Sequence, residues 1–389
     1  MEWKEVDICQ LCDSVSETYK GNASEVVLIN TSDVLDGKCL NHEYVPNKKL
    51  KGQFKKTFRK GDILYSEIRP ANKRFCFVDF EPKDYIASTK LMVLRAHEDV
   101  APQYLYQILR SNDTLAQLQM LAESRSGTFP QITYSELSNI MVSLPSRKAQ
   151  KNIVSILSSL DRKIELNNKI NADLEEMAQA IFKNWFVDFE PFKDGKFVDS
   201  ELGMIPEGWK VGGLFDIAEI FDKKRKPLSG NVREKMDKIY PYYGATSCMD
   251  YVDDYIFDGI YTLIGEDGSV VKENGLPYMQ YVWGKMWVNN HAHILQGKNG
   301  YSTEMIHALL SITNIKFLVT GAVQAKLSQG NMQKILVAIP PKNVLDEIRP
   351  VIDNLYSKIR INTDENSRLS LLRDTLLPRL MSGELEVPE

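Results

Sequence analysis

Two stretches of the sequence, residues 145–186 and 340–381, place apolar residues at helical spacing and align with each other without a gap. A constant offset of 195 residues (340 − 145) relates them. In both, isoleucine or leucine recurs at intervals of seven, starting at Ile153 and at Ile348. This pattern predicts two long amphipathic helices that pack along a shared but imperfect seam.

An asparagine interrupts the seam at the same place in each copy, Asn167 in the first and Asn362 in the second. Two duplicated units most simply relate by a pseudo-two-fold axis, which would make the helices antiparallel and place globular parts at opposite ends. The asparagines would then lie near the middle, where facing polar side chains could fix the register at some cost in stability. The alternative is that each asparagine faces solvent.

The residues before each long helix repeat one order of short β runs, a helix and a final apolar run. An amphipathic segment at residues 8–15, with helical spacing, opens the first half and has a counterpart after Trp209. The first half continues with β runs at 26–30, 61–68, 75–80 and 90–96, a helix at 101–122 and an apolar run at 139–145. In the second half, 258–268 stands at the place of 61–68, and 291–295 at the place of 90–96. Residues 302–312 stand at the place of the helix, and 320–341 at the place of the following loop and the final apolar run.

This order predicts an α/β (α+β) protein with two globular domains joined by two long antiparallel coiled-coil helices. The length of 389 residues agrees with more than one core. A stretch rich in turn formers and without a clear period separates the halves. The expected segments are a first domain at 1–146, a helix at 147–188, a connector at 189–208, a second domain at 209–340, and a helix at 341–383 with a tail to 389.

Composition narrows the class of protein. With 43% hydrophobic and 26% charged residues, the chain resembles soluble globular proteins. It has no run of about 18 apolar residues and no signal-peptide pattern. Five scattered cysteines without a disulfide framework fit a reducing cytosol, so we expect a cytoplasmic protein. The net charge of −4 excludes a uniformly basic nucleic-acid binder and leaves room for local basic patches.

Motifs for catalysis are missing from the sequence. It contains no GxxxxGK[ST] loop, no Asn-Pro-Pro-aromatic motif and no Gly-rich cofactor loop after a strand, which argues against ATP binding and methyl transfer. Cys9 and Cys12 form a CxxC without a second pair, and we interpret both as core thiols. His291 and His293 lack a third ligand in view and are interpreted as satisfied histidines of a strand. We therefore expect no catalytic residue, no metal site and no cofactor bound by this chain.

Positive charge gathers in the β-rich parts. Ten lysines and arginines lie between Lys48 and Arg74, against only Asp62 and Glu67, and a smaller run begins at Lys223. Two such clusters on a rigid spacer match the geometry of a two-site DNA reader, although a charge run is often just a solvated surface. The residues of these clusters that we predict to contact DNA are Lys55, Lys56, Arg59, Arg69, Arg74, Lys224 and Arg225.

The loops before the two final strands are the second candidate for DNA binding. Residues 124–131 align with 319–326 at the same offset of 195. Both loops contain glycine together with side chains that can reach base edges or phosphates. The alternative is an ordinary turn between a helix and a strand. The predicted base-contacting residues are Arg125, Thr128, Gln131, Gln324 and Lys326.

The whole pattern resembles the specificity (S) subunit of type I restriction–modification systems over essentially the entire chain. The stretches that carry the resemblance are GAVQAKLSQGNMQKILVAIPP, QKNIVSILSSLDRKIELNNKINADLEEMAQAIFKNWFVDFEPF, DSELGMIPEGWK, WVNNHAHIL and LRDTLLPRLMSGEL. The resemblance implies two target-recognition domains that each read half of a split DNA sequence, with the two helices acting as a ruler. It does not identify the base-reading residues, because the recognition domains vary between members.

The resemblance also implies partners. It implies a subunit without catalytic activity that recruits two modification (methyltransferase) subunits and then restriction subunits, with S-adenosylmethionine, ATP and Mg bound by those partners. We predict that Phe182, Trp185 and Phe186 belong to the subunit interface, the alternative being a local core at the helix end. The competing function is a two-headed coiled-coil adaptor whose domains bind proteins and do not read DNA.

Overall fold

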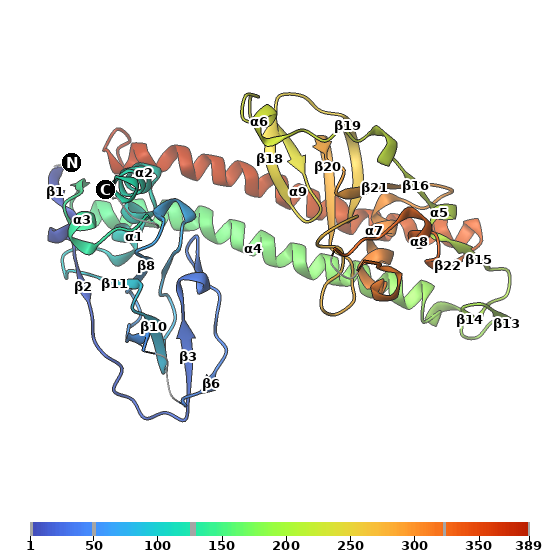
Figure 1. Ribbon diagram of the computed structural model, residues 1–389, viewed down its shortest axis with the longest axis horizontal. Coiled ribbons are helices and arrows are strands. Elements are labelled where there is room, and N and C mark those ends of the chain that lie inside the picture. The colour runs from blue at the N-terminus through green and yellow to red at the C-terminus, as the bar shows by residue number, and fades with distance from the viewer. Residues whose placement is uncertain (1–2, 49–51, 125–129, 322–323, 388–389) are drawn as a thin grey trace. The chain divides into compact units, whose positions relative to one another are not determined.

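The computed structural model describes residues 3–48, 52–124, 130–321 and 324–387 (Figure 1). The chain divides into two compact units. Unit 1 consists of Met1–Glu165 and Asn366–Glu389, and unit 2 consists of Leu166–Glu365. Each unit contains one globular head and a part of both long helices, and each is described by itself.

The two long helices are α4 (Arg147–Phe186) and α9 (Lys342–Met381), each of 40 residues. In unit 1, Asp161 of α4 accepts a bond of 2.9 Å from Arg373 of α9. In unit 2, Asn167 bonds Glu365 and Asn171 bonds Asn362. Within unit 2, residue numbers rise along α4 as those of their α9 partners fall, so the helices are antiparallel, as predicted.

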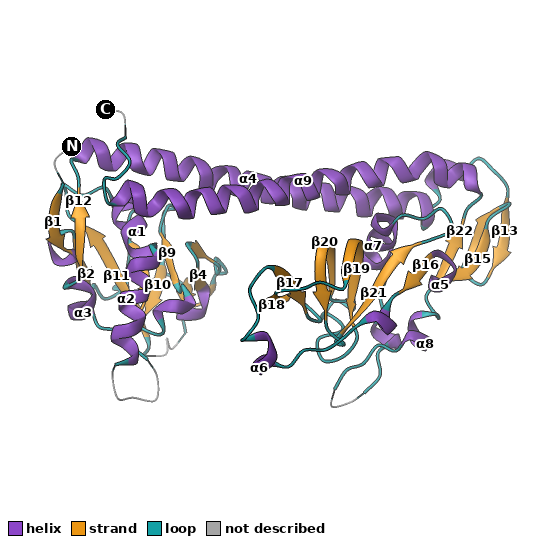
Figure 2. Cartoon of the chain, turned by 90° about the horizontal axis from the view of Figure 1, so that it is seen from above, coloured by secondary structure: helices purple, strands orange, loops and turns teal. Residues whose placement is uncertain are grey.

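The head of unit 1 is built on two four-stranded sheets (Figure 2). Both sheets are antiparallel except for the parallel pair β3–β10. The first has the order β2 (Cys12–Val15), β11 (Leu91–Ala96), β8 (Ile63–Ser66), β9 (Phe75–Phe77). The second has the order β6 (Val45–Pro46), β3 (Glu25–Ile29), β10 (Tyr85–Ser88), β7 (Phe54–Lys56). The remaining strands and helices are β1 (Lys4–Asp7), β12 (Met141–Leu144), β4 (Val34–Leu35), β5 (Lys38–Cys39), α1 (Pro102–Arg110), α2 (Asn112–Glu123) and α3 (Tyr134–Ser138).

The head of unit 2 is built on one six-stranded sheet. Its order is β16 (Ala218–Ile220), β21 (Ala292–Gly297), β19 (Phe257–Gly265), β20 (Met279–Val288), β17 (Tyr240–Tyr243), β18 (Cys248–Val252). Neighbouring strands are antiparallel except β17 and β20. The other elements are the hairpin β13 (Phe197–Ser200) and β14 (Gly203–Pro206), the pair β15 (Lys210–Gly213) and β22 (Leu336–Ile339), and the helices α5 (Leu214–Ile217), α6 (Gly230–Arg233), α7 (Thr303–Ile312) and α8 (Gln329–Met332).

In each head, a strand near the start pairs with the last strand before the long helix, which confirms the internal repeat. β1 pairs with β12 in unit 1, where Lys4 lies opposite Leu144. β15 pairs with β22 in unit 2, where Lys210 lies opposite Ile339. The first members of these pairs differ by 206 positions and the second by 195, the two offsets found in the sequence. The register of one copy therefore reproduces that of the other.

Helix α7 lies between the six-stranded sheet of unit 2 and the long helices (Figure 2). Glu304 of α7 accepts a bond of 2.8 Å from the Tyr281 hydroxyl of β20 and one of 2.6 Å from Arg360 of α9. Glu304 is only 6% exposed, and the nearby guanidinium of Arg360 compensates its buried negative charge. This buried network fixes the sheet to α9 within unit 2.

Four local features differ from what the sequence predicted. The helical pattern at 8–15 forms a 3-10 turn at Ile8–Gln10 and the strand β2, because the backbone of 12–15 pairs with β11. Cys12 is buried but Cys9 is exposed, so the core-thiol interpretation holds for Cys12 only. The predicted helix at 101–122 is two helices, since Ser111 is extended (φ −61°, ψ 145°) and caps α2. The connector contains the hairpin β13–β14, which the sequence did not reveal.

Within the described parts of the chain, no helix combines the length and the apolar character needed to cross a membrane.

Candidate nucleic-acid interface

The loop before the last strand of unit 2 is anchored at the end of β19. The backbone N–H of Leu327 donates to the carbonyl of Glu266 at 2.8 Å, and the N–H of Glu266 donates to the carbonyl of His291 at 2.8 Å. Asp267 and Lys326 form an isolated antiparallel bridge. Leu327 is fully buried, so the loop is attached firmly at its second end.

Unit 1 anchors its loop in the same way. Ile132 donates to the carbonyl of Glu67 at 2.8 Å, and Glu67 donates to the carbonyl of Lys90 at 3.1 Å. Ile68 and Gln131 form the isolated antiparallel bridge. Ile132 stands 195 positions before Leu327, and Gln131 stands 195 positions before Lys326. The two loops predicted to read bases are thus held by equivalent backbone bonds.

Charged side chains converge on the anchor of unit 2. Glu266 lies 2.6 Å from the Nη1 atom of Arg225 and 3.5 Å from the Nζ atom of Lys326. Arg225 also lies 3.4 Å from Asp222, and it donates to the carbonyl of Ala292 at 2.7 Å. The structure therefore brings together two segments that the sequence had assigned separately to DNA binding, the basic run after Lys223 and the loop before β22.

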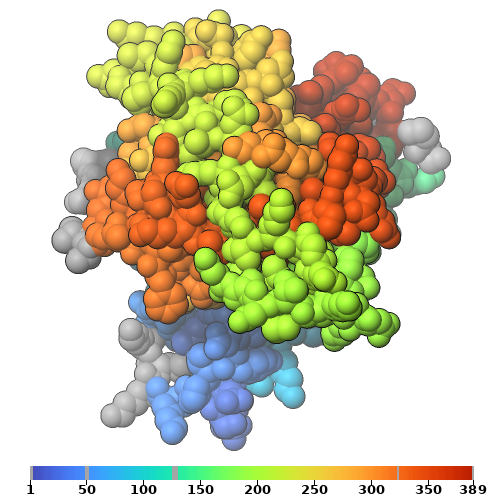
Figure 3. Space-filling view, turned by 90° about the vertical axis from the view of Figure 1, so that its right-hand side faces the viewer, coloured from blue at the N-terminus to red at the C-terminus, as the bar shows by residue number. Residues whose placement is uncertain are grey.

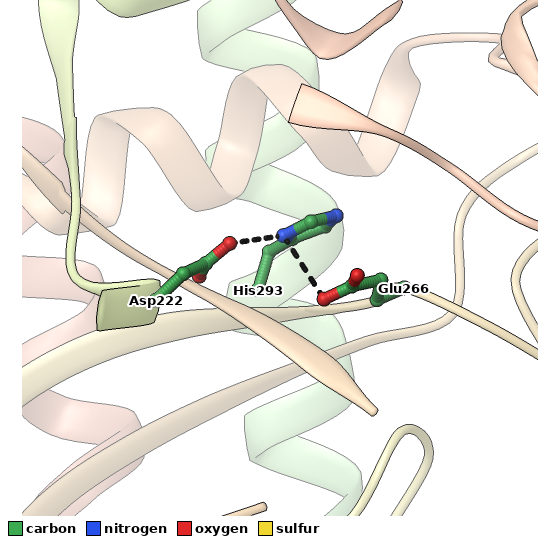
Figure 4. A group of neighbouring side chains, drawn as sticks. All are labelled: Asp222, Glu266 and His293. Carbon is green, nitrogen blue, oxygen red and sulfur yellow. Dashed lines mark hydrogen bonds and ion pairs between the residues drawn. The ribbon is translucent and has the colours of Figure 1, made fainter. Parts of the chain in front are cut away.

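A buried histidine completes this cluster (Figure 4). The Nδ1 atom of His293 lies 2.5 Å from Asp222 and 3.7 Å from Glu266, and its Nε2 atom lies 2.7 Å from the carbonyl oxygen of Leu327. Asp222 also accepts a bond of 2.7 Å from Gln329. Burial alone would raise the pKa of the Asp222 carboxyl, but the bonds from His293 and Gln329 and the charges of His293 and Arg225 lower it overall.

Asp222, Glu266 and His293 bring ligand-type atoms within 4.8 Å of one another, the composition of a small metal site. The guanidinium of Arg225 already pairs with both carboxylates. A divalent cation would have to enter beside this positive charge or displace it. We therefore interpret the group as an ion-pair network that fixes the loop.

The corresponding cluster in unit 1 is smaller and more open. Lys90 places its Nζ atom 3.5 Å from Glu67 and 3.3 Å from the side-chain oxygen of Gln131. The side chain of Glu67 is 24% exposed, against 16% for Glu266. Here a lysine connects the carboxylate to an amide of the loop, whereas in unit 2 the loop itself supplies the lysine.

The remaining predicted DNA contacts fall into two groups. Lys55, Arg59, Arg69, Lys224 and Gln324 are exposed. The charged groups of Lys56 and Arg74 donate to carbonyl oxygens of their own head, at 2.8 Å to Leu91 and 3.0 Å to Ser32. Burial lowers the pKa of Lys56. Arg125 and Thr128 lie outside the described residues. A DNA contact by any of these residues stays a prediction.

The comparison with protein families decides to which family the chain belongs. A model of the type I restriction modification DNA specificity domain matches residues 2–176 and 206–371, one match for each half of the repeat. The chain belongs to the type I restriction–modification specificity family. The resemblance inferred from the sequence motifs is confirmed.

Similar proteins agree with this assignment. The chain is 31% identical to the type I restriction enzyme HindI specificity subunit of Haemophilus influenzae, over 99% of this chain and 100% of that protein. It is 27% identical to the MjaIX specificity subunit of Methanocaldococcus jannaschii, over 90% of this chain and 85% of that protein. The fold is similar to that of a type I restriction–modification S subunit from M. genitalium, with a TM-score of 0.55, 16% identity, and coverage of 98% and 96%.

The aromatic residues at the end of α4 lie mostly inside this specificity subunit. Phe182 and Phe186 are 2% and 6% exposed and stack with their ring centroids 4.5 Å apart. Trp185 is half-buried and packs edge-on against Phe192 of the connector. These positions match the local-core alternative, and a role of the three residues in a subunit interface stays a prediction.

The connector beside these aromatic residues exposes apolar side chains. Val187, just before the connector, is 50% exposed, and Leu202 and Met204 within it are 43% and 55% exposed. The face of unit 2 in Figure 3 carries the connector, drawn in light green, on its surface. In this part of the specificity subunit, a partner could therefore reach connector residues more easily than Phe182 or Phe186.

Sequence reasoning missed the acidic residues of the anchors. Asp222 and Glu266 stand in separate segments, as does the neutral amide Gln329 that donates to Asp222, and only the fold brings them together. A usable signal was nevertheless present. Glu67 and Glu266 lie near the ends of the corresponding β runs 61–68 and 258–268 of the specificity subunit, so their correspondence could have been noticed from the repeat.

Proposed function

We propose that this DNA specificity subunit reads a bipartite target, with one half-site for each head. The support is that both heads carry the same loop anchor, Ile132 on Glu67 in unit 1 and Leu327 on Glu266 in unit 2. Each anchor presents a polar residue at the equivalent loop position, Gln131 or Lys326, and such side chains can bond to base edges. Two copies of one reading device imply two half-sites.

Exchanging one head at a time tests this proposal. Residues 209–340 would be replaced by the equivalent segment of another family member, with both long helices kept. In complex with its modification subunits, the hybrid should methylate a motif that is changed in one half only. The reciprocal exchange of residues 1–146 should change the other half. A change in both halves after a single exchange would contradict one half-site per head.

We further propose that the chain is not catalytic by itself and acts with two modification subunits and with restriction subunits. S-adenosylmethionine, ATP and Mg would then bind to those partners. The missing catalytic motifs in the sequence support this assignment. Transfer of a labelled methyl group to target DNA should require the modification subunit. Transfer by the purified chain alone would overturn the proposal.

The salt dependence of duplex binding distinguishes a DNA reader from a protein adaptor. A DNA reader loses affinity for a duplex steeply as salt rises, because phosphate contacts release counterions. The exposed lysines and arginines of both heads support such behaviour. Duplex affinity of the complex, measured between 50 and 200 mM salt, should therefore fall by orders of magnitude, as the counterion-release relation requires.

A further inference from the structure

One acidic residue in each head stands at the centre of the loop anchor. Glu266 accepts the backbone bond from Leu327, and its carboxylate pairs with Arg225 and Lys326. Glu67 accepts the backbone bond from Ile132, and its carboxylate pairs with Lys90. A carboxylate is an unexpected group beside surfaces that bind a polyanion, since it repels phosphate.

The two cations that pair with Glu266, Arg225 and Lys326, differ in how firmly the surrounding backbone holds them. Besides its bond to Glu266, Arg225 donates to the carbonyl oxygens of Asp222, Asn290 and Ala292, which fixes the guanidinium. The side chain of Lys326 is 54% exposed, and its ammonium is 3.5 Å from Glu266. Glu266 therefore restrains the direction of a loop cation that remains accessible to a ligand.

Unit 1 uses an equivalent carboxylate with a different reading residue. Lys90 connects Glu67 to the amide oxygen of Gln131, which aligns with Lys326. The carboxylate is thus the shared part of the two anchors, and the restrained loop group differs, an amide in one head and an ammonium in the other. This is the pattern expected of a common support for variable base reading.

We propose that Glu67 and Glu266 are positioning residues for DNA recognition: each lowers the affinity of its head for any phosphate backbone and holds Gln131 or Lys326 in the orientation that discriminates bases. The proposal rests on the proposed function. Without the carboxylate, the exposed ammonium of Lys326 pairs with phosphates of any sequence, which strengthens nonspecific binding. Specificity is a difference between affinities, so a repulsive group can raise it.

The substitution Glu266→Gln tests the proposal in the complete complex with modification subunits. It removes one negative charge and keeps the size and the backbone bonds of the residue. Affinity for an unrelated duplex should rise about fivefold, the effect of one unit charge a few ångströms away in water. The ratio of specific to nonspecific affinity should fall about tenfold, the worth of a lost directional base contact. Motif mapping should show relaxed bases only in the half-site of the second head.

Matched variants isolate the cause. Glu219→Gln removes an equal charge from an exposed position on β16 of the same head and should leave both affinities unchanged. Lys326→Met should lower nonspecific affinity, the opposite sign to Glu266→Gln. Glu67→Gln carries the test to unit 1, where the carboxylate is more exposed and folding is less at risk. It should relax the other half-site.

The outcomes distinguish the possible failures. If folded Glu266→Gln and Glu67→Gln bind unrelated DNA no more tightly than the parent complex, the positioning role is overturned. A purely structural role predicts a lower melting temperature and weaker binding to every duplex, and this result would also overturn it. If the parent complex itself shows no salt-dependent binding to any duplex, the proposed function fails, and with it the basis of the inference.

Discussion

Asn171 and Asn362 face each other across the paired helices of unit 2, and the side-chain nitrogen of Asn362 donates to the side-chain oxygen of Asn171 at 2.9 Å. Asn171 also donates to the Thr363 hydroxyl at 3.1 Å. Asn167 and Asn362 are 1% and 2% exposed, so the alternative that they face solvent was wrong. Asn167 bonds Glu365 at 2.7 Å. A buried polar layer thus exists near the two predicted asparagines, in which Asn362 bonds Asn171 and Asn167 bonds Glu365.

Removing one side of this layer should be costly. Asn362→Leu leaves the Asn171 amide oxygen without this donor in the seam, and we expect the free energy of unfolding to fall by about 1–3 kcal/mol. The double variant Asn171→Leu, Asn362→Leu should recover most of the loss, because paired apolar residues suit the seam. Urea unfolding of the parent, both single variants and the double variant measures the coupling. Equal losses in the single and double variants would show that the bond itself contributes little.

Unit 1 joins its head to both long helices through a charged triad. Asp161 of α4 accepts bonds from Arg110 of α1 at 3.0 Å and from Arg373 of α9 at 2.9 Å. Asp161→Asn leaves two guanidinium groups facing each other, and we expect a loss of about 1–3 kcal/mol. Added salt should restore stability to this variant more than to the parent. Asp173→Asn, at an exposed position of the same helix, is the control.

The lowered pKa of Asp222 makes part of the stability of unit 2 depend on pH. A carboxyl whose pKa is lower in the folded state stabilises the fold above its unfolded pKa, about 3.9, and the contribution disappears as pH falls through the folded value. Asp222→Asn should therefore be less stable at pH 7, and its deficit should shrink below about pH 4. Melting temperatures across pH 3–7 test this, with the exposed Asp199→Asn as control. A deficit that is independent of pH would contradict the electrostatic origin.

Phe186 tests whether the end of α4 is core or interface. Its ring stacks on Phe182 and packs edge-on against Trp209 at a centroid distance of 5.8 Å. Phe186→Ala should lower the stability of the chain alone by about 3–5 kcal/mol, as for other buried aromatic residues. Met204→Ala, at an exposed site on the connector, should leave stability unchanged. If Phe186→Ala melts like the parent but fails to bind modification subunits, the ring serves an interface.

If the two long helices set the distance between the half-sites, then longer helices should give a longer spacer. Because α4 and α9 are antiparallel, a lengthened spacer needs equal insertions in both, one after Asn168 and one after Asp364. One heptad in each keeps the apolar residues in the seam and adds about 10 Å, or roughly three base pairs. Motif mapping should then show unchanged half-sites separated by a longer spacer. An unchanged spacer would count against the ruler.

The parts of the fold that the sequence predicted are those with a long or repeated pattern. The long helices could be recognised because the seven-residue spacing persists through both copies. Strand β20 was missed because MQYVWGKMWV does not alternate cleanly, and Gly284 within it has φ +82°. At residues 8–15, pairing with β11 overrode a helical pattern of side chains. The network of Asp222, Glu266 and His293 depends on contacts between distant segments, which no local pattern encodes.

Unit 1 contains residues from both ends of the chain, which determines when its core can be completed during synthesis. Leu377, Leu380 and Val387 are buried in the same core as Ile8 and Tyr104. They leave the ribosome on the order of ten to forty seconds after residue 165, with all of unit 2 in between. Until then, the head made first exposes apolar surface that chaperones can bind. A stop codon between residues 366 and 376 would therefore remove part of the core of unit 1, whose head is translated first, and would leave unit 2 complete.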